Sequence, residues 1–168
     1  MCIRDSPLDL ASPIESFGQQ WPPEQELKLD ATYEGKSGEI AWTDMTVAML
    51  SDDDYQAMDF VKGISDVRGS TVYAHTYVHS PADQDAVLKI GHSRYLTVFL
   101  NGDNICDKPV THRFMRDRES VKVRLKQGAN SLLVKTGNTG GLWKVSLKFV
   151  DAEGKLLRGL KFTRQRER

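Results

Sequence analysis

The sequence predicts an all-β protein, and three observations support this prediction. Apolar and polar residues alternate with the two-residue period of β-strands in several segments, and no apolar period of 3.6 residues persists for three helical turns. The alternating segments recur at the spacing that is typical of antiparallel sandwiches and barrels. Turn sequences separate them, of which Asn101-Gly102 is the clearest. We therefore predict an all-β fold, either an antiparallel β-sandwich or a β-barrel.

The N-terminal third of the chain has the weakest strand patterns. Prolines and polar residues interrupt any period before Pro23, whereas apolar residues alternate with charged ones from Leu27 to Tyr33. We expect an irregular entry segment at 7–23, then a half-buried strand at 27–33 that Gly35 stops, and then a short strand from Ile40 to Trp42. After these we expect a buried apolar segment at 45–50, a solvated acidic loop at 51–54, and a helical turn or strand end at 57–60.

The clearest strand in the first half of the chain is 72–79. Alternation divides its side chains into two faces, one with Val72, Ala74, Thr76 and Val78 and the other with Tyr73, His75, Tyr77 and His79. A turn at 80–83 separates it from a second strand, in which Ala86, Leu88 and Ile90 share a face.

The segment 94–106 predicts a β-hairpin. Leu96, Val98 and Leu100 alternate along one face, and Asn101-Gly102 follows at once. Asn and Gly both tolerate the positive φ that a two-residue type I′ turn requires. We expect this hairpin to lie near the middle of a sheet.

The remaining segments predict four more strands. After a polar loop at 113–118, apolar residues alternate within 121–125, 132–136, 143–149 and 156–162. Glycines make 137–141 an irregular loop, and Asp151 to Gly154 form a turn. We expect residues 1–16 to be an irregular leader whose first six residues are a cloning artefact, 17–162 to form a single domain, and 163–168 to be a charged tail.

Composition disfavours several classes of partner. The 168 residues include 23 acidic and 23 basic side chains, so no net positive field attracts nucleic acid. No apolar run is long enough for a membrane span, and two cysteines are too few for a disulfide framework. We expect no nucleic-acid partner and no membrane span.

The residue patterns do not predict catalysis or a cofactor. No Gly-x-Ser-x-Gly motif is present, and the glycine loop lacks the Lys-Ser/Thr that follows in a phosphate-binding loop. His75 and His79 share a strand face but lie roughly 13 Å apart, too far to bind one metal ion together. The acidic run Asp52, Asp53 and Asp54 does not match a known calcium-binding loop, and we keep a structural calcium ion as an open alternative.

Several motifs, taken together and in order, resemble the galactose-binding-domain-like modules. They are Pro22-Pro23-Glu24, the Tyr33-Glu-Gly-Lys36 turn before Trp42, Val72 to Val78, Leu88-Lys-Ile-Gly91, Val98-Phe-Leu-Asn-Gly102 and Leu125 to Lys135. The resemblance covers about Phe17 to Phe162 and implies a jelly-roll β-sandwich of the kind appended to secreted bacterial glycoside hydrolases. It also implies an extracytoplasmic location and a fragment of a larger glycan-active protein.

A carbohydrate site needs a flat aromatic platform beside planar polar groups. We identify as candidates Tyr73 and Tyr77, the segment with His92, Arg94 and Tyr95, and Trp143 beside the glycine loop. Trp143 alternates in register with apolar residues, so it can equally belong to the core, and Tyr73 and Tyr77 can equally pack beneath a loop.

The predicted function is a non-catalytic carbohydrate-binding module. The alternative is an accessory domain without a ligand that packs against a covalently linked catalytic domain.

Overall fold

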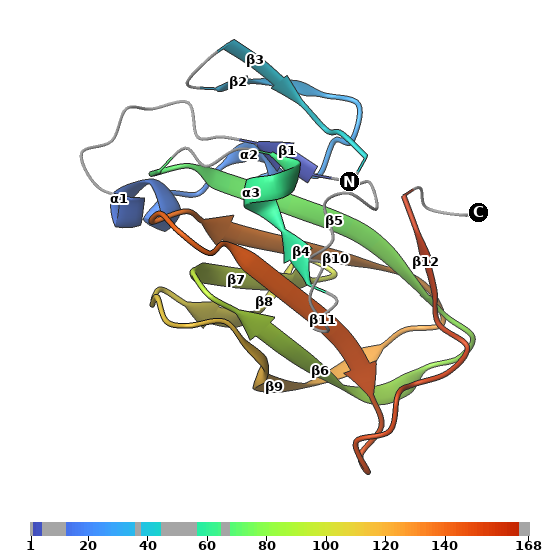
Figure 1. The fold of residues 1–168 in the computed structure, drawn as a ribbon. Helices are drawn as coiled ribbons and strands as arrows, with labels where there is room; N and C mark the ends of the chain where they lie inside the picture. The colour runs from blue at the N-terminus through green and yellow to red at the C-terminus, as the bar shows by residue number, and fades with distance from the viewer. Residues whose placement is uncertain (1, 5–12, 36–37, 45–56, 65–67, 165–168) are drawn as a thin grey trace.

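Two antiparallel sheets form the body of the protein (Figure 1). The computed structural model describes residues 2–4, 13–35, 38–44, 57–64 and 68–164. The larger sheet has the order β1 (Cys2–Arg4), β5 (Thr71–Ser80), β10 (Gly128–Gly137), β7 (Tyr95–Leu100), β8 (Asp103–Lys108), and β12 (Lys161–Thr163) also pairs with β5. The smaller sheet has the order β4 (Met58–Asp59), β11 (Lys144–Val150), β6 (Gln84–His92), β9 (Met115–Leu125). The predicted antiparallel β-sandwich is confirmed.

The core lies between the two sheets. Every second residue of the long strands points into it, as the alternation predicts: Val72 and Val78 from β5, Val98 from β7, Leu88 from β6 and Val145 from β11 are all fully buried. Residues from both sheets belong to one continuous cluster of buried apolar side chains. Burying these faces against each other supplies the main apolar stabilisation of the fold.

A second, smaller apolar cluster covers the outer face of the larger sheet. It contains Trp21, Tyr73 and Leu133, with Tyr33 and Trp42 packed against it. These residues join the sheet to α2 (Pro22–Gln25) and to the hairpin of β2 (Thr32–Gly35) and β3 (Gly38–Ala41). The remaining N-terminal element, α1 (Pro13–Gly18), packs on the sheet through Phe17, which contacts Tyr95. In Figure 1 these elements, coloured blue to cyan, lie on the side of β5 that faces away from the smaller sheet.

The N-terminal elements correct two expectations. Residues 1–16 are not wholly irregular, because β1 pairs with β5 and α1 begins at Pro13. The predicted strand at 27–33 is largely absent, since α2 precedes it and β2 begins only at Thr32. At 57–60 the expectation of a helical turn or a strand end is confirmed, since β4 lies there and α3 (Phe60–Gly63) begins at Phe60. The expectations for 45–50 and 51–54 and for the tail beyond Arg164 lie outside the described residues.

The Asn101-Gly102 hairpin is confirmed, and its position is corrected. Both residues have positive φ, 54° and 91°, as a type I′ turn requires. The hairpin joins β7 to β8, and β8 has no further partner among the described strands, so the hairpin forms one edge of the larger sheet. Asn101 Nδ2 donates to Oδ1 of fully buried Asn130, which ties the turn to the start of β10.

Two predicted boundaries in the C-terminal half are also corrected. The segment 113–118 is not a loop throughout, because β9 begins at Met115 and continues past a bulge opposite 90–92 in β6. The predicted strand at 156–162 shortens to β12, with Leu156 forming only an isolated bridge to Val150.

Candidate ligand-binding site

A hollow of about 340 Å³ lies on the outer face of the larger sheet, and we call it the outer-face hollow. Its floor comes from three neighbouring strands, its walls from α2 and from the hairpin turn at Asn101-Gly102. The residues that line it are Pro23, Glu24, Gln25, Leu27, Tyr77, Phe99, Asn101, Gly102, Ala129, Ser131 and Leu133. Its size falls in the range of small-molecule sites.

Strand register places two aromatic rings in this hollow. Tyr77 of β5 pairs with Ser131 of β10, and Phe99 of β7 pairs with Leu133 of β10, so all four side chains share the outer face. Tyr77 and Phe99 are half-buried. The floor therefore has an aromatic side chain on each side of β10.

Polar groups lie beside these rings. The Asn101 side chain accepts a hydrogen bond from the Ser131 backbone N–H at 3.0 Å, and Ser131 Oγ lies 3.0 Å from His75 Nε2. Gln25 and Glu24 add an amide and a carboxylate from α2. The hollow thus combines apolar ring faces with amide, hydroxyl and carboxylate groups, the combination that sugar hydroxyls and C–H faces require.

A buried ionic cluster holds the α2 wall in place. Glu24 Oε1 accepts hydrogen bonds from Lys135 Nζ at 2.7 Å, the Tyr73 hydroxyl at 2.5 Å and the Trp21 backbone N–H at 3.1 Å. Lys135 Nζ also donates to the Gln19 carbonyl, and its side chain is only 4% exposed. The cluster fixes the N-terminal segment to the centre of the larger sheet.

The electrostatics of the cluster follow from burial. Burial lowers the pKa of Lys135, and the hydrogen bond to Glu24 opposes that shift by favouring the ammonium form. Burial and the bond to Glu24 together raise the pKa of Tyr73, which remains a neutral donor. The cluster has a structural role, because all three side chains already satisfy one another.

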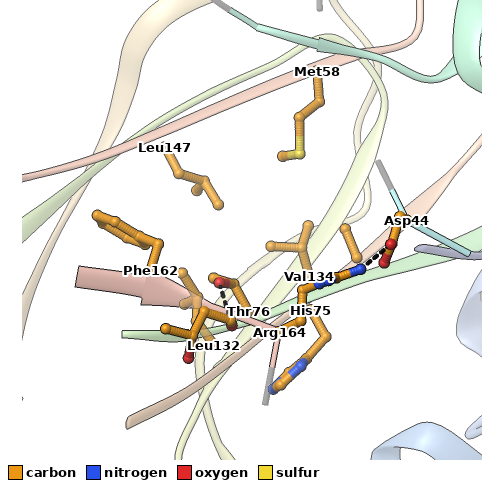
Figure 2. Close-up of a pocket in the computed structure, with 11 residues that line it drawn as sticks. Asp44, Met58, His75, Thr76, Leu132, Val134, Leu147, Phe162 and Arg164 are labelled. Atoms are coloured by element: carbon orange, nitrogen blue, oxygen red, sulfur yellow. Dashed lines mark hydrogen bonds and ion pairs between the residues drawn. The ribbon is translucent and has the colours of Figure 1, made fainter. Parts of the chain in front are cut away.

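A second concavity, the edge cleft, opens between the two sheets and has a volume of about 430 Å³. Figure 2 shows Met58 and Leu147 from the smaller sheet on one side, and Leu132 and Val134 from the larger sheet on the other. Phe162 lies at one end and the Arg164–Asp44 ion pair at the other. Its lining is mainly apolar, and its charged side chains, Arg164 and Asp44, are paired with each other.

The six candidate residues that the sequence indicated do not lie together in one site. Tyr77 lines the outer-face hollow, whereas Tyr73 is 3% exposed beneath α2, and its hydroxyl is bonded to Glu24. Tyr73 and Tyr77 do share a strand face, as expected, but only Tyr77 offers its side chain to the hollow.

Trp143 and His92 belong to the interior. Trp143 is 1% exposed, packs against Phe60 with ring centroids 5.3 Å apart, and donates from Nε1 to Thr136 Oγ1. His92 is fully buried, and its Nδ1 lies 2.7 Å from the Arg94 carbonyl. Burial lowers the pKa of His92. We do not include either side chain in the candidate site, since neither has an accessible surface.

Arg94 and Tyr95 lie at the start of β7, away from the hollow. The Tyr95 ring is half-buried against Phe17, with centroids 5.4 Å apart. The Arg94 guanidinium is half-buried and donates to the Gly140 carbonyl of the glycine loop. Their role in ligand binding stays a prediction.

Sequence patterns missed Phe99, Asn101 and Ser131 as site residues. Phe99 was visible on the aromatic face of its strand, and Asn101 was identified only for its turn conformation. Neither pattern indicates which strand lies next to which, and that adjacency is what brings them beside Tyr77.

No group of three or more His, Cys, Asp or Glu side chains among the described residues is arranged to hold a metal ion. The candidate calcium residues Asp52, Asp53 and Asp54 lie outside the described ranges. None of the described helices is long and apolar enough to cross a membrane.

Comparisons with known proteins find likeness in structure but not in sequence. No family model matches the chain, and no curated protein matches it either. The PA14 domain of the MpAFP antifreeze protein aligns with a TM-score of 0.46 and 11% identity, over 56% of this chain and 52% of that one. The PA14 sugar-binding domain from an RTX adhesin aligns with a TM-score of 0.44 and 8% identity, over 55% of this chain and 51% of that one.

CBM35 from Paenibacillus barcinonensis aligns with a TM-score of 0.37 and 14% identity, over 62% of this chain and 86% of that one. The aligned part spans about half the length of the two PA14 domains. Since all three TM-scores are below 0.5, these alignments do not show a shared function.

Proposed function

We propose that this protein is a non-catalytic carbohydrate-binding domain and that the outer-face hollow is its sugar site. The observation that carries this proposal is the placement of Tyr77 and Phe99 on either side of β10, beside Asn101 and Ser131. Ring faces can stack on the apolar C–H face of a pyranose, while amide and hydroxyl groups bond its hydroxyls.

The resemblance to galactose-binding-domain-like modules supports the same function. It extends the proposal to a location outside the cytoplasm and to a covalently linked glycan-active domain. The sequence motifs that carry it include Val98 to Gly102, which supplies both Phe99 and Asn101 to the hollow.

Titration of neutral mono- and oligosaccharides by calorimetry, preceded by a glycan array, tests the proposal. Phe99→Ala and Tyr77→Ala should each weaken binding roughly fivefold or more, because an aromatic contact contributes about 0.5–1.5 kcal/mol beyond its buried area. Tyr77→Phe keeps the ring and should retain most of the affinity.

Phe162→Ala is the matched control, since Phe162 is an exposed aromatic residue at the edge cleft rather than in the hollow. Its sugar affinity should equal that of the unmodified protein. Flat titrations at millimolar sugar, or a loss with Phe162→Ala but not with Phe99→Ala, would contradict the proposed site.

The edge cleft favours the second candidate function, an accessory domain that packs against a catalytic neighbour. Its apolar lining and the 58% exposure of Phe162 are features of a surface that another domain covers. Linking the chain to its natural neighbour should then protect Phe162 from solvent, which hydrogen exchange of β12 can measure, and sugar titrations should stay flat.

A further inference from the structure

Two arginines lie against the same pair of glycines in the loop between β10 and β11. Arg94 donates from Nη2 to the Gly140 carbonyl. Arg68 lies so close to Gly140 that a Cβ added there would meet Arg68 Nε, and a Cβ on Gly141 would be 2.8 Å from Arg94 Nη2. Both glycines have positive φ, 98° and 77°, a conformation that glycine adopts readily and other residues adopt rarely.

No carboxylate in the described part of the chain balances the positive charge of this arginine pair. Neither Arg68 nor Arg94 forms an ion pair with any carboxylate in the described part of the chain, although Arg118, Arg124 and Arg164 all do. Burial and the neighbouring Arg68 lower the pKa of Arg94, which is the expected effect of bringing two like charges together. Such an arrangement favours an anion as its third member.

Arg94 also has unused hydrogen-bonding capacity. Its Nε–H is buried and has no acceptor among the described residues. An unmade hydrogen bond from a buried donor is costly, so the present arrangement leaves this side chain under-satisfied. A guanidinium has five N–H donors in a planar fork that suits carboxylate, sulfate and phosphate oxygens.

We propose that Arg68 and Arg94, held on the Gly140-Gly141 loop, form a binding site for an oxyanion, such as the carboxylate or sulfate of an acidic ligand. The site is separate from the outer-face hollow, because none of its residues lines that hollow. It therefore goes beyond the binding of neutral sugars and assigns Arg94 to a different ligand chemistry.

Nuclear magnetic resonance titration of the full chain with sodium sulfate, sodium glucuronate and inorganic phosphate tests the site. Ionic strength is held constant with sodium chloride, because screening alone shifts exposed groups. The amides of Gly140 and Gly141 and the Nε–H of Arg94 should shift and saturate. Glucose at the same concentration should not move them.

Arg68→Gln should weaken sulfate binding roughly tenfold or more, since hydrogen bonds to charged groups are the strong ones. Arg68 is exposed, so this variant should fold even if Arg94→Gln, which also loses the bond to Gly140, does not. Arg124→Gln is the matched control, because Arg124 is an exposed arginine already paired with Asp85. It should bind sulfate like the unmodified protein.

Tighter binding of glucuronate than of sulfate and phosphate would support the site and identify an acidic sugar as its source, whereas equal binding of all three would support a general oxyanion site. Shifts that never saturate, or equal affinity in Arg68→Gln and the unmodified protein, would overturn the inference. Neutral-sugar binding through Phe99 is measured separately, so failure of one proposal leaves the other intact.

Discussion

Glu24→Ala should destabilise the protein more than any exposed substitution in the N-terminal segment. Glu24 Oε1 is the common acceptor for Lys135, Tyr73 and the Trp21 backbone, and the Lys135 side chain is only 4% exposed. Removing the carboxylate leaves the Lys135 ammonium with the Gln19 carbonyl as its remaining hydrogen-bond acceptor among the described residues. Breaking a buried ion pair on one side costs about 3–5 kcal/mol. We expect a loss of that size in the free energy of unfolding.

Urea unfolding followed by tryptophan fluorescence measures the loss, because Trp21 lies in the segment that Glu24 holds. Lys135→Met in the Glu24→Ala background should recover part of it, since the unpaired ammonium is then gone. Sugar binding should also fall, because α2 forms one wall of the outer-face hollow.

Glu26→Ala is the matched control in the same segment. Glu26 pairs with Lys28 on the surface, where both side chains are more than half exposed, so its unfolding midpoint should stay close to that of the unmodified protein. If Glu24→Ala were as stable as Glu26→Ala, or if adding Lys135→Met only added a further loss, the cluster would not hold the segment on the sheet.

Two further predictions concern acid stability and the hairpin turn. Burial lowers the pKa of His75 to about 4, below its usual value near 6.5, so the unfolded chain binds the proton more readily between those values. The free energy of unfolding should therefore be highest above about pH 6.5 and fall as the pH decreases toward 4. Urea titrations of His75→Gln should show a flatter dependence of this free energy on pH across that window. The same dependence in His75→Gln and in the unmodified protein would contradict this role for His75. Gly102→Val should lower the melting temperature, because Gly102 has a φ of 91°, which valine adopts only at a cost of about 1–2 kcal/mol. A Cβ at this position meets no atom within 4 Å, so this cost is conformational and does not come from a steric clash. Gly102→Asn, which tolerates positive φ, should lose less, and equal melting temperatures for Gly102→Val and the unmodified protein would refute the turn assignment.

The sequence alone determined the fold class, the main strands and the division of each strand into two faces. Val72 and Val78 lie in the core, and Tyr73 and Tyr77 lie on the opposite face of β5, because a strand turns successive side chains to opposite sides whatever its neighbours are. Asn101-Gly102 fixed its turn for an equally local reason, since positive φ is allowed for these two residue types.

Local patterns did not determine the boundaries of elements that depend on distant partners. β1 exists because Cys2–Arg4 finds the free edge of β5, and the strand expected at 156–162 shortens because only 161–163 continues that edge. Alternation shows that a segment can pair, but hydrogen bonds to a particular neighbour decide where pairing begins and ends.

Only the tertiary structure decided what covers the outer face of the larger sheet, and therefore where a ligand site can exist. Alternation put Tyr73, His75 and Tyr77 on one face but could not show that the N-terminal segment would bury the first two and leave Tyr77 at the hollow. That outcome depends on the hydrogen bond between Lys135 and Glu24, which are 111 residues apart in the sequence. The periodicity of a single strand does not predict such a contact. The physical reason is that periodicity is set by the backbone of one strand, whereas exposure is set by whatever other part of the chain packs on it.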